Sequence, residues 1–159
     1  MALLIVSLLV ISLLIFHELG HVLAAKIMGL EIKKVGVSLK PYPHVFVAVE
    51  WAKEKLKRYI FLFSGTTVTI TLFFISIAFN FFELQYLLYA FIFQLILETN
   101  PFFSDFAIAI VTNIAEKQKI TIDENYFQKV YAKYVFSFGW YLHFSIWIIL
   151  ILLLLTNLK

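Results

Sequence analysis

The sequence FHELGH places two histidines and one glutamate at the end of a long apolar segment. His17 and His21 are four residues apart, so their imidazoles share one face if this segment is helical. With Glu18 they form the pattern H-E-x-x-H, in which both imidazoles can bind zinc while the glutamate handles the proton of a water molecule. Zinc lowers the pKa of a bound water to about 7 and polarises a carbonyl group. The chemistry predicted from these residues is metal-assisted hydrolysis.

The same pattern also arises by chance in helices that bind no metal. Its surroundings favour a metal here, because residues 1–15 carry no charged side chain. Ionisable side chains inside a bilayer are costly unless something compensates them. A metal ion supplies that compensation for His17 and His21, whereas Lys26 can extend its ammonium group to the membrane interface. We therefore expect a bound Zn²⁺.

The composition is that of a membrane protein. Of the 159 residues, 62% are hydrophobic and 14% are charged, against about 25% charged residues in ordinary soluble domains. The net charge of +3 is too small to indicate a nucleic-acid partner, and the absence of Cys excludes thiolate metal sites. The expected fold class is an all-α polytopic membrane protein whose residues 1–159 form a single membrane-embedded domain, with the lipid bilayer as a partner.

Four apolar segments are long enough for spans of ~20 residues, at about 2–28, 59–79, 84–111 and 134–155. The first lacks a basic n-region, so we expect a retained span and not a signal peptide. Basic residues gather in loops 29–58 and 112–133, whereas residues 80–83 hold no Lys or Arg. The positive-inside rule predicts that both basic loops are cytoplasmic and that both termini lie outside the cell membrane.

The first loop contains the pattern of a β-strand. Val45, Val47 and Val49 alternate with other residues in PHVFVAVEW, and the preceding KKVGVSL can form a partner strand. We expect a small β-hairpin between the first two transmembrane helices. Its strand could bind an extended substrate by backbone pairing, or the hairpin could simply cover the loop. In the later basic loop, Asp123 is expected to cap a helix that runs into the last span.

A catalytic zinc site needs a third protein ligand. The candidates are His44, Glu98, Asp105 and His143. Counted along regular helices, His17 lies ~22 Å into the first span, Glu98 ~21 Å into the third and Asp105 ~31 Å into the third. Depth therefore favours Glu98. Pro101 is expected to break this helix, however, which shifts the estimate by several ångströms and leaves both carboxylates open. His143 is alone in its span and is expected to be a packing or hydrogen-bonding residue.

HELGH in the first span and NPFFSD in the third resemble the site-2 protease family of intramembrane zinc metalloproteases. The resemblance covers residues 1 to about 111. It implies that His17 and His21 are zinc ligands, that Glu18 is the general base and that Asp105 is the third ligand.

The resemblance also implies that Asn100 and Pro101 open the third span near the metal. The Asn100 side chain could hold the substrate or the developing oxyanion, or it could cap the broken helix. The strand with Val45, Val47 and Val49 resembles the membrane-associated β element of the family. These three valines and Asn100 are the residues expected to bind substrate.

The expected function is an intramembrane zinc endopeptidase of the kind that acts in regulated intramembrane proteolysis. Its partner would be a transmembrane or membrane-associated peptide substrate. The alternative is a catalytically inactive chaperone, immunity or interaction subunit of the same fold. Phe106 after Asp105 favours this alternative, since the family usually has Gly there. A metal transporter is disfavoured because the second and fourth spans offer almost no acidic or histidine residues.

Overall fold

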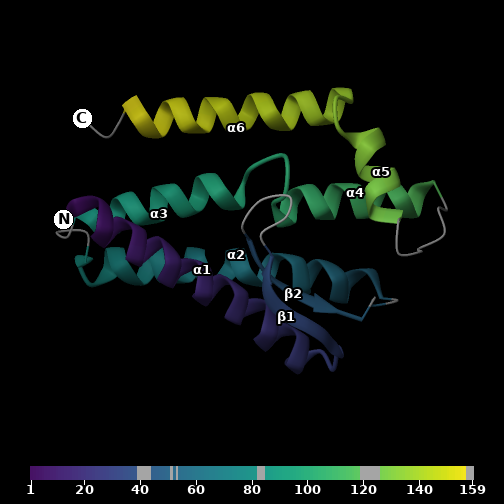
Figure 1. Cartoon of the computed structure of the whole chain (residues 1–159), viewed down its shortest axis with the longest axis horizontal. Helices are drawn as coiled ribbons and strands as arrows, with labels where there is room; N and C mark the ends of the chain where they lie inside the picture. The colour runs from purple at the N-terminus through teal and green to yellow at the C-terminus, as the bar shows by residue number, and fades with distance from the viewer. Residues whose placement is uncertain (39–43, 51, 53, 82–84, 119–125, 157–159) are drawn as a thin grey trace. The chain divides into compact units, whose positions relative to one another are not determined.

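The computed structural model describes residues 1–38, 44–50, 52, 54–81, 85–118 and 126–156. In these residues the chain is mostly helical and has one two-stranded antiparallel sheet (Figure 1). The elements in chain order are α1 (Ala2–Ile27), β1 (Ile32–Ser38), β2 (His44–Val49), α2 (Lys55–Ala78), α3 (Gln85–Glu98), α4 (Asp105–Lys117), α5 (Tyr126–Tyr134) and α6 (Phe138–Thr156). The predicted helical class, with a small hairpin between the first two apolar helices, is confirmed. The chain divides into two compact units, Met1–Gln94 and Leu95–Lys159.

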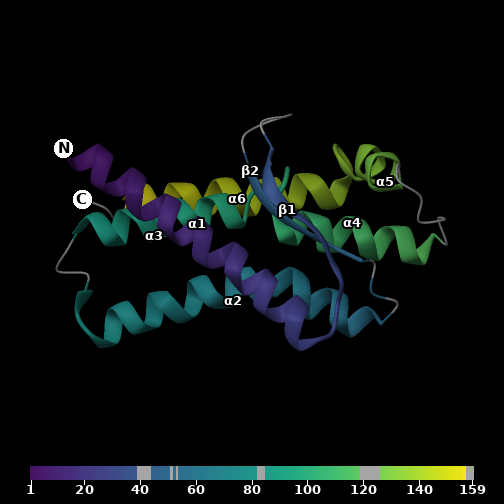
Figure 2. The same cartoon turned by 60° about the horizontal axis from the view of Figure 1, so that its bottom comes forward.

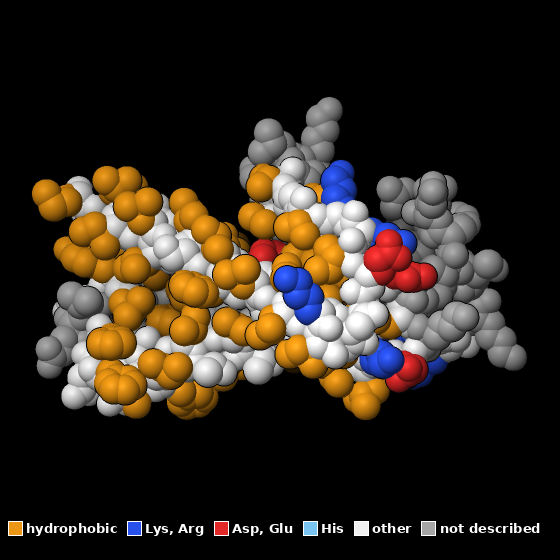
Figure 3. Space-filling view, turned by 90° about the horizontal axis from the view of Figure 1, so that it is seen from below, with side chains coloured by type: hydrophobic (Ala, Val, Ile, Leu, Met, Phe, Trp, Pro, Cys, Tyr) orange, Lys and Arg blue, Asp and Glu red, His pale blue; other side chains and the backbone are white. Residues whose placement is uncertain are grey.

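Two helices, α1 and α2, are long and apolar enough to cross a membrane, and α3 and α6 are shorter apolar helices. α1 carries an exposed apolar stripe along most of its length. The members of this stripe, each more than half exposed, are Leu4, Leu8, Ile11, Ile15, Leu19 and Leu23. They recur every three or four residues and therefore lie on one side of the helix. In Figure 3 hydrophobic side chains cover one end of the face in view, and most Lys, Arg, Asp and Glu side chains lie toward the other.

α1 and α2 cross at two glycines, Gly20 and Gly65. A Cβ atom at Gly20 would lie 2.8 Å from the carbonyl oxygen of Ser64 and 3.2 Å from Cα of Gly65. Small residues at a helix crossing let the two backbones approach closely, as is common inside membranes. Figures 1 and 2 both show α1 running across α2. The crossing brings the face of α1 that carries His17, Gly20 and His21 against α2.

The hairpin follows α1 through Gly29, whose φ of +67° is the left-handed conformation that ends many helices. The amide of Leu30 donates to the carbonyl oxygen of Ala25 at 2.8 Å and closes this helix end. The register pairs Val37 with Val45, Val35 with Val47 and Ile32 with Val49, with an irregularity between Ile32 and Lys34. β2 packs against α1. The expected turn of the hairpin, residues 40–43, lies outside the described residues.

The predicted apolar span 84–111 contains two helices and not one. α3 ends at Glu98 and α4 begins at Asp105. This break confirms the prediction from Pro101, which cannot donate to the carbonyl four residues before it. Ser104 caps the new helix, because its hydroxyl accepts the amide hydrogen of Ala107 at 3.2 Å.

The last apolar helix, α6, begins a turn later than the segment 134–155 predicts. Phe136 has a φ of +63°, which ends α5, and the hydroxyl of Ser137 accepts the amide hydrogen of Trp140 to begin α6. α4, α5 and α6 share a small core of buried side chains. Its members are Val111, Ala115, Val130, Tyr134 and Trp140. Asp123, the expected helix cap, lies outside the described residues.

Candidate metal centre

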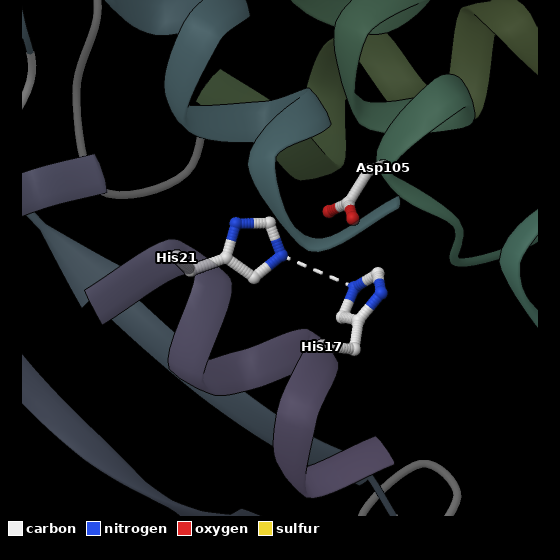
Figure 4. Close-up of side chains that lie close together, drawn as sticks. All are labelled: His17, His21 and Asp105. Atoms are coloured by element: carbon white, nitrogen blue, oxygen red, sulfur yellow. Dashed lines mark hydrogen bonds between the residues drawn. The ribbon is translucent and has the colours of Figure 1, made fainter. Parts of the chain in front are cut away.

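His17 and His21 are both buried, at 7% and 4% exposure. Their Nε2 atoms lie 3.2 Å apart, and the two rings meet edge to face (Figure 4). Two nitrogen ligands of a tetrahedral zinc ion, each bonded at 2.0–2.1 Å, are about 3.3 Å apart. The pair on α1 therefore has the separation that two ligands of one zinc ion require.

The other nitrogen of His21 is held by α2. His21 Nδ1 lies 2.8 Å from the carbonyl oxygen of Phe61 and 3.2 Å from the hydroxyl of Ser64. A carbonyl oxygen can only accept, and the Ser64 hydroxyl itself donates to Phe61 at 2.6 Å, so Nδ1 carries the hydrogen. The neutral ring then keeps its lone pair on Nε2, facing His17. An anchored Nδ1–H is the usual support of a histidine that binds a metal through Nε2.

Gly65 of α2 makes room for the His17 ring. A Cβ atom at Gly65 would lie 2.5 Å from Nε2, 2.6 Å from Cε1 and 2.7 Å from Cδ2 of His17. Real carbon atoms do not approach an imidazole so closely, so any side chain at this position must displace the ring. The helix crossing at Gly20 and Gly65 thus positions the nitrogen pair as well as the two backbones.

Replacing Gly65 with alanine is expected to weaken zinc binding more than about tenfold, because the new methyl group displaces the Nε2 atom of His17 from its place beside His21. Competition with a chromophoric chelator measures the affinity. Gly139→Ala is the matched control, since the nearest atom to its new Cβ, Ser137 Oγ, is 3.9 Å away. Equal zinc affinity in the two variants would contradict the role assigned to Gly65.

Glu18 follows His17 on α1 and is half-buried. The chain order of H-E-x-x-H therefore places one carboxylate on the same helical turn as the nitrogen pair. A carboxylate at this position can accept a proton from water and release it again.

The second unit holds the two acidic candidates for a third ligand. Asp105 is half-buried and is the first residue of α4, where its negative charge is favoured by the helix dipole. Glu98 is buried at the last position of α3. The segment between them is the α3–α4 break, residues 99–104.

Asn100 uses its side chain within the α3–α4 break. Its Oδ1 accepts the amide hydrogens of Phe102 at 2.9 Å and Phe103 at 2.8 Å, and its Nδ2 donates to the carbonyl oxygen of Leu97. These bonds match the alternative in which Asn100 caps the broken helix. For the Asn100 amide to contact substrate, some of these hydrogen bonds would have to be replaced by bonds to the substrate. That substrate contact stays a prediction.

His143 on α6 differs from the histidine pair on α1 in its contacts. Both ring nitrogens of His143 contact protein groups, the carbonyl oxygen of Thr99 at 3.0 Å and the hydroxyl of Tyr134 at 3.1 Å. This confirms the expected hydrogen-bonding role of His143. His44 is the first residue of β2.

The three valines expected to bind substrate all lie in β2. Val45, Val47 and Val49 are half-buried and pair with β1 in the register given above. The described residues form a sheet of two strands only, so each strand pairs along one of its edges. An extended peptide could therefore add at an edge of this sheet, and that role stays a prediction.

The parts of this site that sequence reasoning missed are the partners of His21 on α2. Phe61 contributes a backbone carbonyl group, which has no signature in a sequence, and Ser64 is one of several small residues in the same helix.

No family model, no curated protein and no solved structure matches this chain.

Proposed function

We propose that this protein is an intramembrane zinc endopeptidase that hydrolyses peptide bonds in or near membrane segments of a small protein or peptide. The observation that carries the proposal is the geometry of the histidine pair. Two buried Nε2 atoms 3.2 Å apart, one of them on a ring whose Nδ1 is held by a carbonyl group, suit a shared metal ion.

The proposed ligands are His17, His21 and Asp105, three side chains of the types that bind metal ions. Two imidazoles and one carboxylate are a ligand set that catalytic zinc sites use, with a fourth position open for water or substrate. When bound, zinc lowers the pKa of water and polarises the substrate carbonyl.

Glu18 is the proposed general base. Its carboxylate takes a proton from the attacking water and returns that proton to the nitrogen of the leaving amine. The backbone of β2 is proposed to hold the substrate as an extended strand, which exposes peptide bonds that a helix would hide in its own hydrogen bonds. Val45, Val47 and Val49 would then contact substrate side chains, which alternate along an extended strand.

The proposed location is the cell membrane, with four spans, both termini outside and the loops 29–58 and 112–133 in the cytoplasm. The exposed apolar stripe of α1 supports this location. Exposing a row of leucines and isoleucines to water costs free energy, whereas exposing them to lipid does not. The close glycine crossing of α1 and α2 is also typical of helix pairs in membranes.

Metal analysis of the purified protein tests the proposal. The parent is expected to hold close to one equivalent of zinc, whereas His17→Ala and His21→Ala are each expected to lose it, because a site with one ligand fewer no longer holds the ion. Elemental analysis after gel filtration in detergent measures the zinc content. His44→Ala is the control, since it removes an imidazole from β2 and is expected to leave the zinc in place. A parent without zinc, or histidine variants that keep it, would refute the proposal.

A further inference from the structure

The α3–α4 break leaves backbone carbonyl groups without helical partners in an apolar part of the chain. In a continuous helix, the amide of residue 100 would donate to Ile96 and that of residue 101 to Leu97. Pro101 has no amide hydrogen, and the chain leaves the helix after Glu98. Exposed carbonyl groups are tolerated in a membrane only where protein or water satisfies them.

Side chains of α6 satisfy two of these groups. Trp147 Nε1 donates to the carbonyl oxygen of Ile96 at 2.9 Å. His143 Nε2 lies 3.0 Å from the carbonyl oxygen of Thr99, and since a carbonyl can only accept, this nitrogen carries the ring hydrogen. His143 Nδ1 is then the acceptor for the hydroxyl of Tyr134 at 3.1 Å.

A third bond reaches the break from α5. The hydroxyl of Tyr131 donates to the carbonyl oxygen of Phe102 at 2.6 Å. Burial raises the pKa of the Tyr131 phenol, so this group keeps its hydrogen at neutral pH. His143 and Trp147 are four residues apart and lie on one face of α6. The three donors therefore hold carbonyl groups along residues 96–102, the segment that leads into Asp105.

We infer that His143 and Trp147 are positioning residues for the proposed metal site, which act by holding the α3–α4 break and thereby the start of α4 at Asp105. This inference rests on the proposed function, because it takes Asp105 as a zinc ligand. It assigns to α6 a role besides crossing the membrane. Residues that orient a metal ligand through hydrogen bonds commonly change metal affinity by 10–100-fold when they are replaced.

Two tryptophans of α6 provide a matched test. Trp140 and Trp147 both contact the ring of Phe102, at centroid distances of 5.6 Å and 6.4 Å. Trp147 Nε1 bonds Ile96, whereas Trp140 Nε1 is buried without a hydrogen-bond partner among the described residues. Replacement of either tryptophan by phenylalanine therefore reduces a comparable ring contact with Phe102, but only the replacement of Trp147 also removes a hydrogen bond.

Trp147→Phe is expected to bind zinc about tenfold more weakly than the parent, and Trp140→Phe to stay within about twofold of it. Chelator competition in detergent measures both affinities. Amide hydrogen exchange of the metal-free proteins is expected to be faster over residues 99–106 in Trp147→Phe only, because the break opens more often. His143→Leu is expected to behave like Trp147→Phe, and His143→Gln to recover part of the affinity, since its amide can still donate to Thr99.

Several results would overturn the inference. One is equal zinc affinity and equal exchange in the two tryptophan variants. Another is His143→Gln binding zinc as weakly as His143→Leu, which would show that the donor at this position does not matter. If the parent itself binds no zinc, the proposed function fails together with the positioning role. If the parent binds zinc and Trp147→Phe binds it equally well, only the positioning role fails.

Discussion

Replacing Glu18 with glutamine is expected to abolish peptide-bond hydrolysis and to leave the zinc content unchanged. Glutamine has nearly the same size as glutamate, but its amide cannot accept the proton of water at neutral pH. Loss of a general base costs on the order of 10²–10⁴-fold in rate. Glu18 is not a proposed zinc ligand, so the ion should stay bound. The single substitution therefore separates the chemical step from metal binding.

Membranes of cells that express the parent or Glu18→Gln provide the measurement. They are incubated in water enriched in oxygen-18, and mass spectrometry identifies new peptide carboxyl termini that carry the heavy oxygen. Hydrolysis by the parent must produce such termini, and the variant must not. Glu31→Gln is the control, because Glu31 is exposed and pairs with Lys33 at 2.7 Å on the surface, where ion pairs contribute little to stability.

The alternative of an inactive membrane subunit predicts a different result for Glu18→Gln. Parent and variant would then give the same set of termini, and neither would incorporate heavy oxygen at a new site. Loss of zinc in Glu18→Gln would contradict the proposal in another way, because the carboxylate would then be part of the metal site itself.

Replacing Asp105 with asparagine is expected to weaken zinc binding more than about 100-fold, beyond the effect of residues that only orient a ligand. An amide oxygen is a poor ligand for zinc compared with a carboxylate, whereas the size of the side chain is kept. Ser104 caps α4 through its own hydroxyl, so the start of the helix should survive the change. Chelator competition measures the affinity, and circular dichroism checks the helix content.

Glu98→Gln is the matched variant for Asp105→Asn. Glu98 is the buried carboxylate that depth along the third span favours as an alternative ligand. Because Glu98 is not a proposed ligand, Glu98→Gln is expected to keep zinc affinity within about tenfold of the parent, at or below the smallest loss that follows replacement of a residue that orients a ligand. The reverse order, with Glu98→Gln losing the zinc and Asp105→Asn keeping it, would assign the third position to Glu98.

Local pattern was enough to predict most elements of this fold. The long apolar segments predicted α1 and α2, the alternating valines predicted β2 and its partner, and Pro101 predicted the break between α3 and α4. These features depend on neighbours within a few residues, so the sequence alone carries them. The start of α6 was less predictable, because it depends on a left-handed residue, Phe136, that no composition rule would place there.

The sequence by itself determined that His17 and His21 lie on one face of a helix, because residues four apart are neighbours on a helical surface. Only the tertiary structure decided that their Nε2 atoms lie 3.2 Å apart and that the carbonyl group of Phe61 holds His21. The contact of Gly65 with His17 and the bond from Trp147 to Ile96 were likewise invisible in the sequence. The contacts of His21 with Phe61, of His17 with Gly65 and of Trp147 with Ile96 all join residues about 40 or more positions apart. Two of these partners are backbone carbonyl groups, which are chemically the same at every residue.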